Sequence, residues 1–144
     1  MNSDIKPNDP ASLWRRLAAM SYDGLLAIAL WFLIEMIAVG INHGQAITAS
    51  QIPFVQTAVF ISLFIFFAWF WMHGGQTLGM RAWRLHLVSQ TDKPIRLPQC
   101  LLRFLVAFIS AGCLGLGFLW MLWDKDKLTW HDRYSMTRVI YIKK

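Results

Sequence analysis

Charge is the first thing this sequence lacks. Only 15% of its 144 residues are charged, against roughly 25% in typical soluble domains. No Asp, Glu, Lys or Arg stands between Glu35 and Arg81, a gap of 45 residues. A soluble domain of this size cannot easily spare so long a stretch from its charged surface. The gap therefore argues against a soluble globular protein.

Cysteine and catalytic motifs are also scarce. Two cysteines, Cys100 and Cys113, cannot make a disulfide-stapled scaffold. The four histidines show no metal-ligand spacing and have no cysteine close by. No Ser-His-Asp order, H-E-x-x-H motif or P-loop is found. We therefore expect no metal, no cofactor and no enzymatic activity.

What the sequence does have is long apolar runs. Hydrophobic residues make up 56% of the chain, which excludes a disordered protein. They form three blocks of 25, 21 and 20 residues, at 17–41, 52–72 and 104–123. About 20 helical residues cross the bilayer core, and a chain this short cannot bury three such helices. We predict one membrane domain over 1–144, and the first block is too long for a signal peptide, so it should stay as an anchor.

The positive charges indicate the orientation. The chain carries 14 Lys and Arg against 8 Asp and Glu. No Lys or Arg lies in the loop 42–51. All of them lie in the N-terminal arm, in residues 73–103 or in the tail 124–144. The positive-inside rule places the arm and residues 73–103 in the cytoplasm and the loop outside, whereas the side of the tail depends on the third block. Charges beside membrane spans suit anionic lipid head groups, so we expect the bilayer, not nucleic acid, as their partner.

Tryptophan flanks the apolar blocks. Amphipathic indole rings concentrate at the two membrane–water interfaces. We therefore predict that these side chains form interfacial belts, not a ligand cage: Trp14, Trp69, Trp71, Trp120 and Trp123.

The third block is harder to place. If it crosses the membrane fully, the six positive residues of the tail end up outside. Gly112, Gly115 and Gly117 lie at its centre, and each weakens a helix by about 1 kcal/mol relative to alanine. The backbone could reverse there, provided that protein covers it. A plain third span with a glycine packing face is the alternative; the charge count favours the re-entrant hairpin.

A small β element is predicted beside the membrane. Residues 82–88 alternate apolar and polar side chains, which is typical of a half-buried strand. A return strand could begin at 95–97, after a turn at 90–94. Residues 138–142 are also strand-like, and pairing them with 82–88 would require both to lie on one side of the membrane. The predicted fold is an all-α membrane protein of two spanning helices and a glycine-broken third segment, with a small cytoplasmic β-hairpin element.

One acid lies inside the first apolar block. Asp23 follows Arg16 by seven residues, nearly two helical turns, so both share a stripe with Ala19 and Ala27. Facing lipid, Asp23 would cost roughly 2.5–3.5 kcal/mol, so it should face protein or water. It is either a structural latch held by Arg16 or another cation, or a proton- or cation-binding carboxylate. Glu35 lies about 120° around the helix and near its outer end, which makes it a weaker candidate.

Several short motifs, taken in order, resemble one family. They are RLAAMSYD at 16–23, GQTLGMR at 75–81, Arg103 before the third block, HDR at 131–133 and TRV at 137–139. In this order they resemble the RDD family, named for one arginine and two aspartates. The resemblance covers nearly the whole chain. It implies Arg16 as the arginine, Asp23 as the first aspartate and Asp132 as the second, with Asp124 as the alternative.

The resemblance also implies a location and a range of functions. The family consists of small bacterial multi-pass membrane proteins, for which transport of an undefined ligand has been proposed, and cation/proton antiport for some members. It implies the bacterial cytoplasmic (inner) membrane, with the N-terminus cytoplasmic. The rival expectation is a non-catalytic scaffold or accessory subunit in which the same charges form a latch. A chain this small would enclose a pathway only as a homo-oligomer or with a partner membrane protein.

The candidate functional residues follow from the acids and from these motifs. His131 could titrate near neutral pH and relay protons towards Asp23. The stronger candidates are Arg16, Asp23, Arg103, His131 and Asp132, and the weaker ones are Asp124, Gln76 and Glu35.

Overall fold

The computed structural model describes residues 9–91 and 93–142. Lys6 of the arm and Asp92 of the predicted turn lie outside these residues. The chain is mostly helical and carries one small sheet. Its elements are α1 (Leu13–Ile41), α2 (Ile52–Met72), α3 (Leu78–Ala82), β1 (Leu85–Ser89), α4 (Leu97–Gly112), α5 (Leu116–Leu119), the 3₁₀ turn η1 (Trp120–Leu122), α6 (Trp130–Tyr134) and β2 (Thr137–Tyr141).

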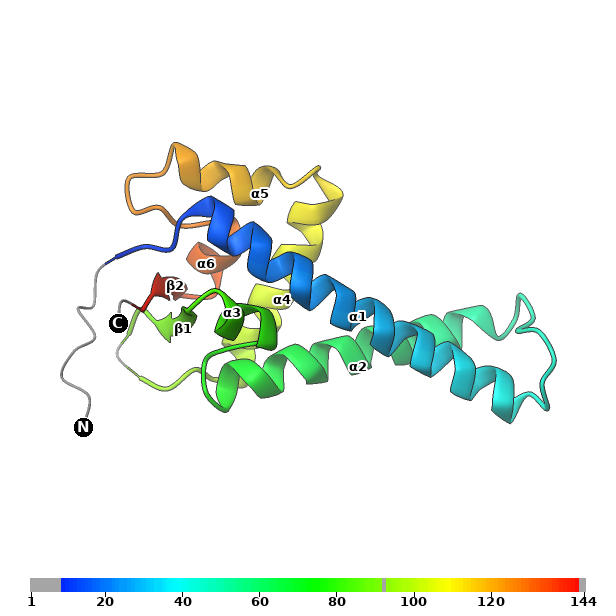
Figure 1. Cartoon of the computed structure of the whole chain (residues 1–144). Helices are drawn as coiled ribbons and strands as arrows, with labels where there is room; N and C mark the ends of the chain where they lie inside the picture. Colours follow the sequence, from blue (N-terminus) through cyan, green and yellow to red (C-terminus); the bar gives the residue numbers. More distant parts are fainter. Residues whose placement is uncertain (1–8, 92, 143–144) are drawn as a thin grey trace.

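The two long helices form an antiparallel pair joined by the loop 42–51 (Figure 1). Both are long and apolar enough to cross a membrane. The bounds of α2 are those of the second apolar block, and α1 begins four residues before the first block, at Leu13. Apolar side chains surround both helices over most of their length, as lipid would require.

The third apolar block is broken, as its glycines predicted. Helices α4 and α5 meet at an angle of 107°. Gly115 lies in the break with φ +76°, a left-handed conformation that glycine adopts without the cost of a Cβ. By composition the bent pair could form a broken span or a re-entrant loop. The chain before α4 and the chain after α6 join the same sheet, so this segment leaves and returns to one end of the molecule (Figure 1).

The sheet pairs distant parts of the chain. Strand β1 is antiparallel to β2, in register from Leu85 opposite Tyr141 to Ser89 opposite Thr137. The N-terminal segment adds a bridge from Pro10 to Ile140 on the other edge of β2. The pairing with the tail is therefore confirmed, whereas the local β-hairpin with a return strand at 95–97 was wrong. Leu97 begins α4 instead, with a proline in its first turn, where the missing N–H costs no hydrogen bond.

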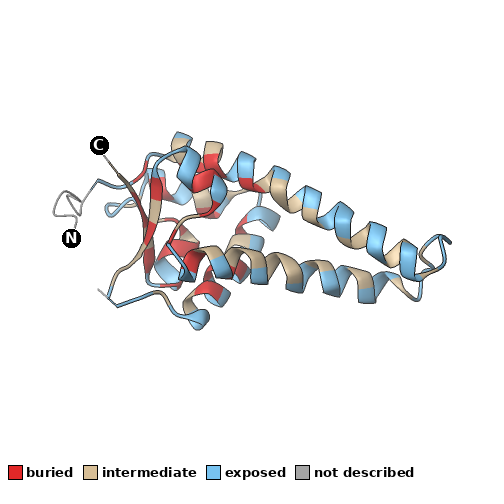
Figure 2. Ribbon diagram, turned by 60° about the horizontal axis from the view of Figure 1, so that its bottom comes forward, coloured by how far each residue is buried: buried red, intermediate tan, exposed pale blue. Residues whose placement is uncertain are grey.

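Buried residues gather around this sheet, at what we call the sheet end of the molecule (Figure 2). Leu85, Leu87 and Val139 of the strands pack with Phe104 of α4 and Ala19 of α1. Beyond them, the far halves of α1 and α2 leave their apolar side chains exposed. The charged candidate residues of α1, α4 and α6 therefore lie at the sheet end, where most of the buried residues of the described fold are found.

Candidate functional site

Helix α1 turns one narrow stripe towards the protein. Its buried residues are Arg16, Ala19 and Asp23, which share a face because they are spaced by three and four residues. The predicted stripe is therefore found. The two charged side chains at its ends do not bind each other, and each has its own partners.

Arg16 binds Asp132. Nη1 of Arg16 lies 2.5 Å from Oδ2 of Asp132, and Nη1 of Arg103 lies 2.5 Å from the other oxygen, Oδ1. Asp132 is completely buried, and each arginine is about nineteen-twentieths buried. We call these three residues the Arg–Asp–Arg cluster. It joins α1, α4 and α6, three elements that are far apart in the sequence.

The backbone holds the members of this cluster in place. Thr129 is the N-cap of α6, and its Oγ1 accepts a hydrogen bond from the backbone N–H of Asp132 at 3.3 Å. Asp132 Oδ2 accepts one in return from the N–H of Thr129 at 3.4 Å, which completes a capping box. Arg16 also donates to the carbonyl oxygens of Ala11 and Val139, both at 3.2 Å. The capping box at the start of α6 therefore orients the Asp132 carboxylate, and the carbonyl oxygens of Ala11 and Val139 orient the Arg16 guanidinium.

The cluster carries a net positive charge. Burial alone would raise the pKa of Asp132, but the guanidinium groups of Arg103 and Arg16 hold that pKa well below its ordinary value. One carboxylate therefore faces two guanidinium groups. The Arg103 guanidinium also lies 5.5 Å from the centre of the Trp71 ring. Trp71 is buried, so its assignment to an interfacial belt was wrong.

His131 stays neutral beside the cluster. Its Nε2 lies 3.0 Å from Thr129 Oγ1, and its ring packs on Phe118 with centroids 4.6 Å apart. Burial, and then the positive charge of Arg103, lowers the pKa of His131 to about 3. The expectation that His131 titrates near neutral pH and relays protons is therefore wrong. Its Nδ1 is buried and has no partner among the residues that the structure describes.

Asp23 binds the start of α3. Thr77 Oγ1 donates to Oδ2 of Asp23 at 2.5 Å, and the backbone N–H of Gly79 donates to Oδ1 at 2.9 Å. Within the described ranges, no Lys or Arg nitrogen comes within 4.0 Å of this carboxylate. The idea that Arg16 or another cation holds Asp23 is therefore wrong. Asp23 is held by a hydroxyl and by a free N–H at a helix start.

Helix α3 lies very close to α1 at this point. A Cβ on Gly79 would stand 2.1 Å from the carbonyl oxygen of Ala19 and 2.9 Å from Asp23. Only glycine allows this approach, which in turn lets the N–H of Gly79 reach Asp23.

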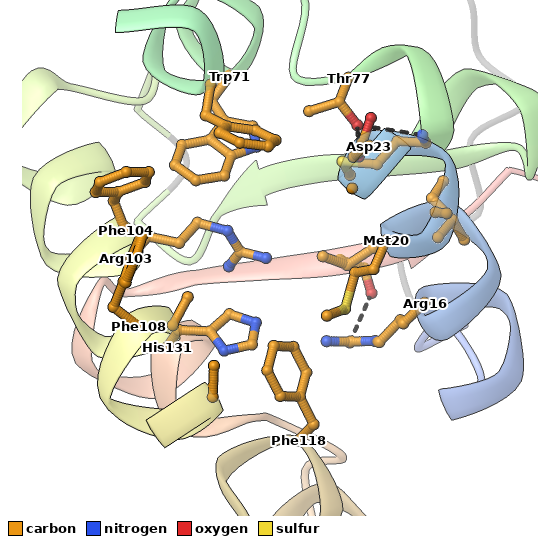
Figure 3. Close-up of a pocket in the computed structure, with 18 residues that line it drawn as sticks. Arg16, Met20, Asp23, Trp71, Thr77, Arg103, Phe104, Phe108, Phe118 and His131 are labelled. Carbon is orange, nitrogen blue, oxygen red and sulfur yellow. Dashed lines mark hydrogen bonds between the residues drawn. The ribbon is translucent and has the colours of Figure 1, made fainter. Parts of the chain in front are cut away.

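A cavity of about 310 Å³ separates the two charged groups. Figure 3 shows Arg16, Arg103 and His131 on one side and Asp23 with Thr77 on another. Aromatic and aliphatic side chains form the rest of its lining, and they come from α1 to α5 and from both strands of the sheet. Asp132 is not part of the lining. It lies behind the arginines and fixes them at the wall.

The three weaker candidates lie elsewhere. Gln76 donates to the carbonyl oxygen of Leu85 at 2.6 Å and so fixes the loop before α3. Glu35 accepts from the indole of Trp31 at 3.0 Å, on the exposed part of α1. Asp124 binds Arg133 at 2.7 Å, away from the Arg–Asp–Arg cluster. Of the two candidates for the second aspartate, only Asp132 contacts Arg16.

Sequence reasoning missed three residues of the site. Thr77 and Thr129 each precede a short helix, and the Thr-x-x-Asp spacing from Thr129 to Asp132 is a capping signature that could have been found. Nothing in the local pattern separates Trp71 from Trp69, although one is buried and the other is 58% exposed.

Comparison with known proteins gives one match. The model of the RDD family matches residues 10–136, which is most of the chain. Neither a curated protein nor a solved structure matches. The matched range contains every lining residue with a charge or a titratable ring. Among the described residues, no group of three His, Cys, Asp or Glu side chains could hold a metal ion.

Proposed function

The chain belongs to the RDD family, and from this premise we propose that it is a transporter, or a subunit of one, that binds a small ligand in the cavity between α1, α2 and α4. One observation supports this proposal. Charged side chains from α1 and α4, the two apolar segments that carry them, line a cavity whose remaining wall is mostly apolar. Charges at such a place are costly and are usually retained for a substrate or ion pathway.

We further propose an orientation. The sheet end lies in the cytoplasm of a bacterial cell, the loop 42–51 lies outside, and the segment α4–α5 re-enters the inner membrane. The absence of Lys and Arg from that loop supports the orientation. The shared sheet supports re-entry, because it places the two ends of the segment together.

Asp23 is the candidate proton-binding group in this proposal. When ionised it accepts two hydrogen bonds from the start of α3, and protonation would remove the charge that strengthens both. Helix α3 would then be held less tightly beside the cavity, while its close packing against α1 at Gly79 would remain. Protonation of Asp23 would in this way change how α3 packs at the cavity wall, without a proton relay through His131.

A scaffold or accessory subunit is the second candidate. The Arg–Asp–Arg cluster favours it, because its contacts tie three elements together and so act as a latch. Asp23 would then serve only to fasten α3 to α1. A chain that stays monomeric in detergent would support this candidate, whereas transport calls for a homo-oligomer or a partner membrane protein.

The two candidates separate in one experiment on Asp23→Asn. The asparagine oxygen can still accept from the N–H of Gly79 but the side chain cannot bind a proton. The purified chain is reconstituted in vesicles holding a pH-sensitive dye, and Na⁺ or K⁺ pulses are applied. The transport proposal expects a cation-driven proton flux in the wild type that is lost in the variant, with an unchanged denaturation midpoint.

The control for this experiment is Glu35→Gln, which neutralises an acid of the same helix away from the cavity. It should keep its flux. Flux that persists in Asp23→Asn would overturn the proton-binding role. A variant that unfolds at lower temperature would favour the scaffold, and no flux from either cation in the wild type would overturn proton-coupled cation transport.

A further inference from the structure

Two residues of the cavity wall, Arg103 and His131, each have one side-chain nitrogen without a hydrogen-bond partner among the described residues. Arg103 makes its hydrogen bonds through Nη1 alone, to Asp132 and to Thr137 at 3.1 Å. Over residues 9–91 and 93–142, its Nη2 has no acceptor within hydrogen-bonding distance. Nδ1 of His131 is also unpartnered. The two residues are 6% and 5% exposed. A polar nitrogen left unpaired away from water destabilises the fold, and an acceptor placed in the cavity would remove that cost.

The contact between His131 and Thr129 fits the ring tautomer that carries its hydrogen on Nδ1. Thr129 Oγ1 already accepts from the N–H of Asp132, so its own hydroxyl hydrogen is free to bond Nε2 of His131 at 3.0 Å. Nε2 is then the acceptor, and the hydrogen of the neutral ring is on Nδ1. His131 therefore presents an N–H donor to the cavity.

The charge at this wall is positive. Two guanidinium groups and one carboxylate give the Arg–Asp–Arg cluster a charge of +1, and His131 adds none. Asp23, on another side of the cavity, already receives two hydrogen bonds. A single anion at the wall would therefore balance the cluster, whereas a cation there would be repelled.

The rest of the cavity is apolar and opens on an apolar flank. Phe67, Phe104 and Phe118 supply rings to its wall. Met20 of α1 and Phe108 of α4 also line it and are 40% and 49% exposed, so the mouth lies beside them. Its 310 Å³ is near the lower end of ligand pockets, which span ~300–1,000 Å³. This volume suits one head group and part of one hydrocarbon chain.

We propose that the cavity binds a single-chain amphiphile with one anionic head group, a carboxylate or a phosphate monoester. The head group accepts hydrogen bonds from Nη2 of Arg103 and Nδ1 of His131. The hydrocarbon chain lies against the phenylalanine rings and leaves between Met20 and Phe108. This proposal names the ligand class for the proposed transport function, and it rests on that function only for the fate of the bound molecule.

The test is equilibrium binding of radiolabelled dodecanoate to the full-length chain in a nonionic detergent. Dodecyl phosphate should compete with it. Dodecanol and dodecyltrimethylammonium should compete at least about tenfold less well, because they lack the charge-assisted hydrogen bonds. Equal competition by dodecanol, or stronger competition by the cation, would overturn the proposal. Equal competition by phosphatidylglycerol supplied in nanodiscs would overturn its single-chain part.

Two variants locate the binding site. Ala107 lines the cavity, so Ala107→Phe should fill it and reduce dodecanoate binding at least about tenfold. The matched control is Ala58→Phe, on an exposed position of α2, which should bind as the wild type does. His131→Phe keeps an aromatic ring against Phe118 but removes the donor. It should reduce the preference for dodecanoate over dodecanol several-fold and leave dodecanol binding unchanged.

These outcomes are independent of transport. Retained binding in Ala107→Phe, or an unchanged head-group preference in His131→Phe, would overturn the cavity site. Dodecanoate binding without any flux in vesicles would keep the site and overturn the transport function. Proton-coupled cation flux without dodecanoate binding would keep the transport function and overturn the amphiphile site.

Discussion

Asp132 is the residue whose loss should cost the most. Asp132→Asn leaves two buried guanidinium groups without a counter-ion. Removing one member of a buried ion pair typically costs about 3–5 kcal/mol. We expect a large fall in the thermal denaturation midpoint in detergent. Asp124→Asn is the matched control: its arginine is 53% exposed, so the expected cost is under about 1 kcal/mol. Equal midpoints for the two variants would contradict the assignment.

His131 makes stability depend on pH. The pKa of His131 is about 3 in the folded chain and 6.5 in the unfolded chain. At a pH between these two values, the ring is protonated in the unfolded state but not in the folded state. Stability should therefore fall as pH drops below about 6.5, by up to about 1.4 kcal/mol per pH unit. His131→Phe should flatten this dependence, measured as the denaturation midpoint between about pH 5 and pH 7.

The exposed His73 supplies the comparison for this prediction. His73→Phe should keep the wild-type dependence on pH. Burial also lowers the pKa of His86, so a smaller slope of the same sign should remain in His131→Phe. A slope that is unchanged in His131→Phe would contradict the buried, neutral state of this ring.

At the residue scale, sequence identified the charged groups but not their pairing. Asp23 could be recognised because an acid in an apolar run has to face protein. Its partner could not, because a hydroxyl and a backbone N–H leave no charge pattern to find. Arg16 and Asp132 are 116 residues apart, so only the family resemblance connected them before the fold was known.

Among the elements, the contact of α3 with α1 gives the sharpest test. Gly79→Ala would place a methyl group 2.1 Å from the backbone oxygen of Ala19, so α3 must move and its bond to Asp23 must break. Overpacking of this kind costs about 1–3 kcal/mol. The denaturation midpoint should fall accordingly.

Gly40→Ala is the control for this change. Gly40 also lies in a helix, but a Cβ there would meet nothing within 4 Å. Alanine favours a helix over glycine by up to about 1 kcal/mol, so this variant should be as stable as the wild type or more so. A Gly79→Ala chain that matches Gly40→Ala would show that α3 does not need this close approach.

Sequence predicted elements better than their pairing. The ends of α2 follow directly from its apolar run, and the break in the third block follows from its glycines. The β-hairpin was wrong because residues 95–97 look like a strand, whereas Arg96 caps α4 and Leu97 begins it, with Pro98 in the first turn. The strand-like residues 138–142 did indicate the partner of β1, although no turn signal links two strands so far apart in the sequence.

For the whole molecule, the shared sheet makes a prediction about topology. In a Cys113→Ser background, Ser50→Cys and Lys125→Cys place single reactive thiols on exposed positions of the loop 42–51 and of the tail. The proposed orientation expects a membrane-impermeant maleimide to label Ser50→Cys in intact cells. It should label Lys125→Cys only after permeabilisation. Labelling of Lys125→Cys in intact cells would show a complete third span and overturn re-entry.

The Arg–Asp–Arg cluster also forms late during translation, because its members are far apart in the sequence. Asp132 is made 116 residues after Arg16, which at ~5–20 residues per second takes roughly 6–23 s. Arg16 therefore reaches the bilayer before its counter-ion exists. Every apolar segment has been synthesised by the time Asp132 emerges from the ribosome. Neutralisation of Arg16 therefore waits until the last apolar segment of the chain has been synthesised.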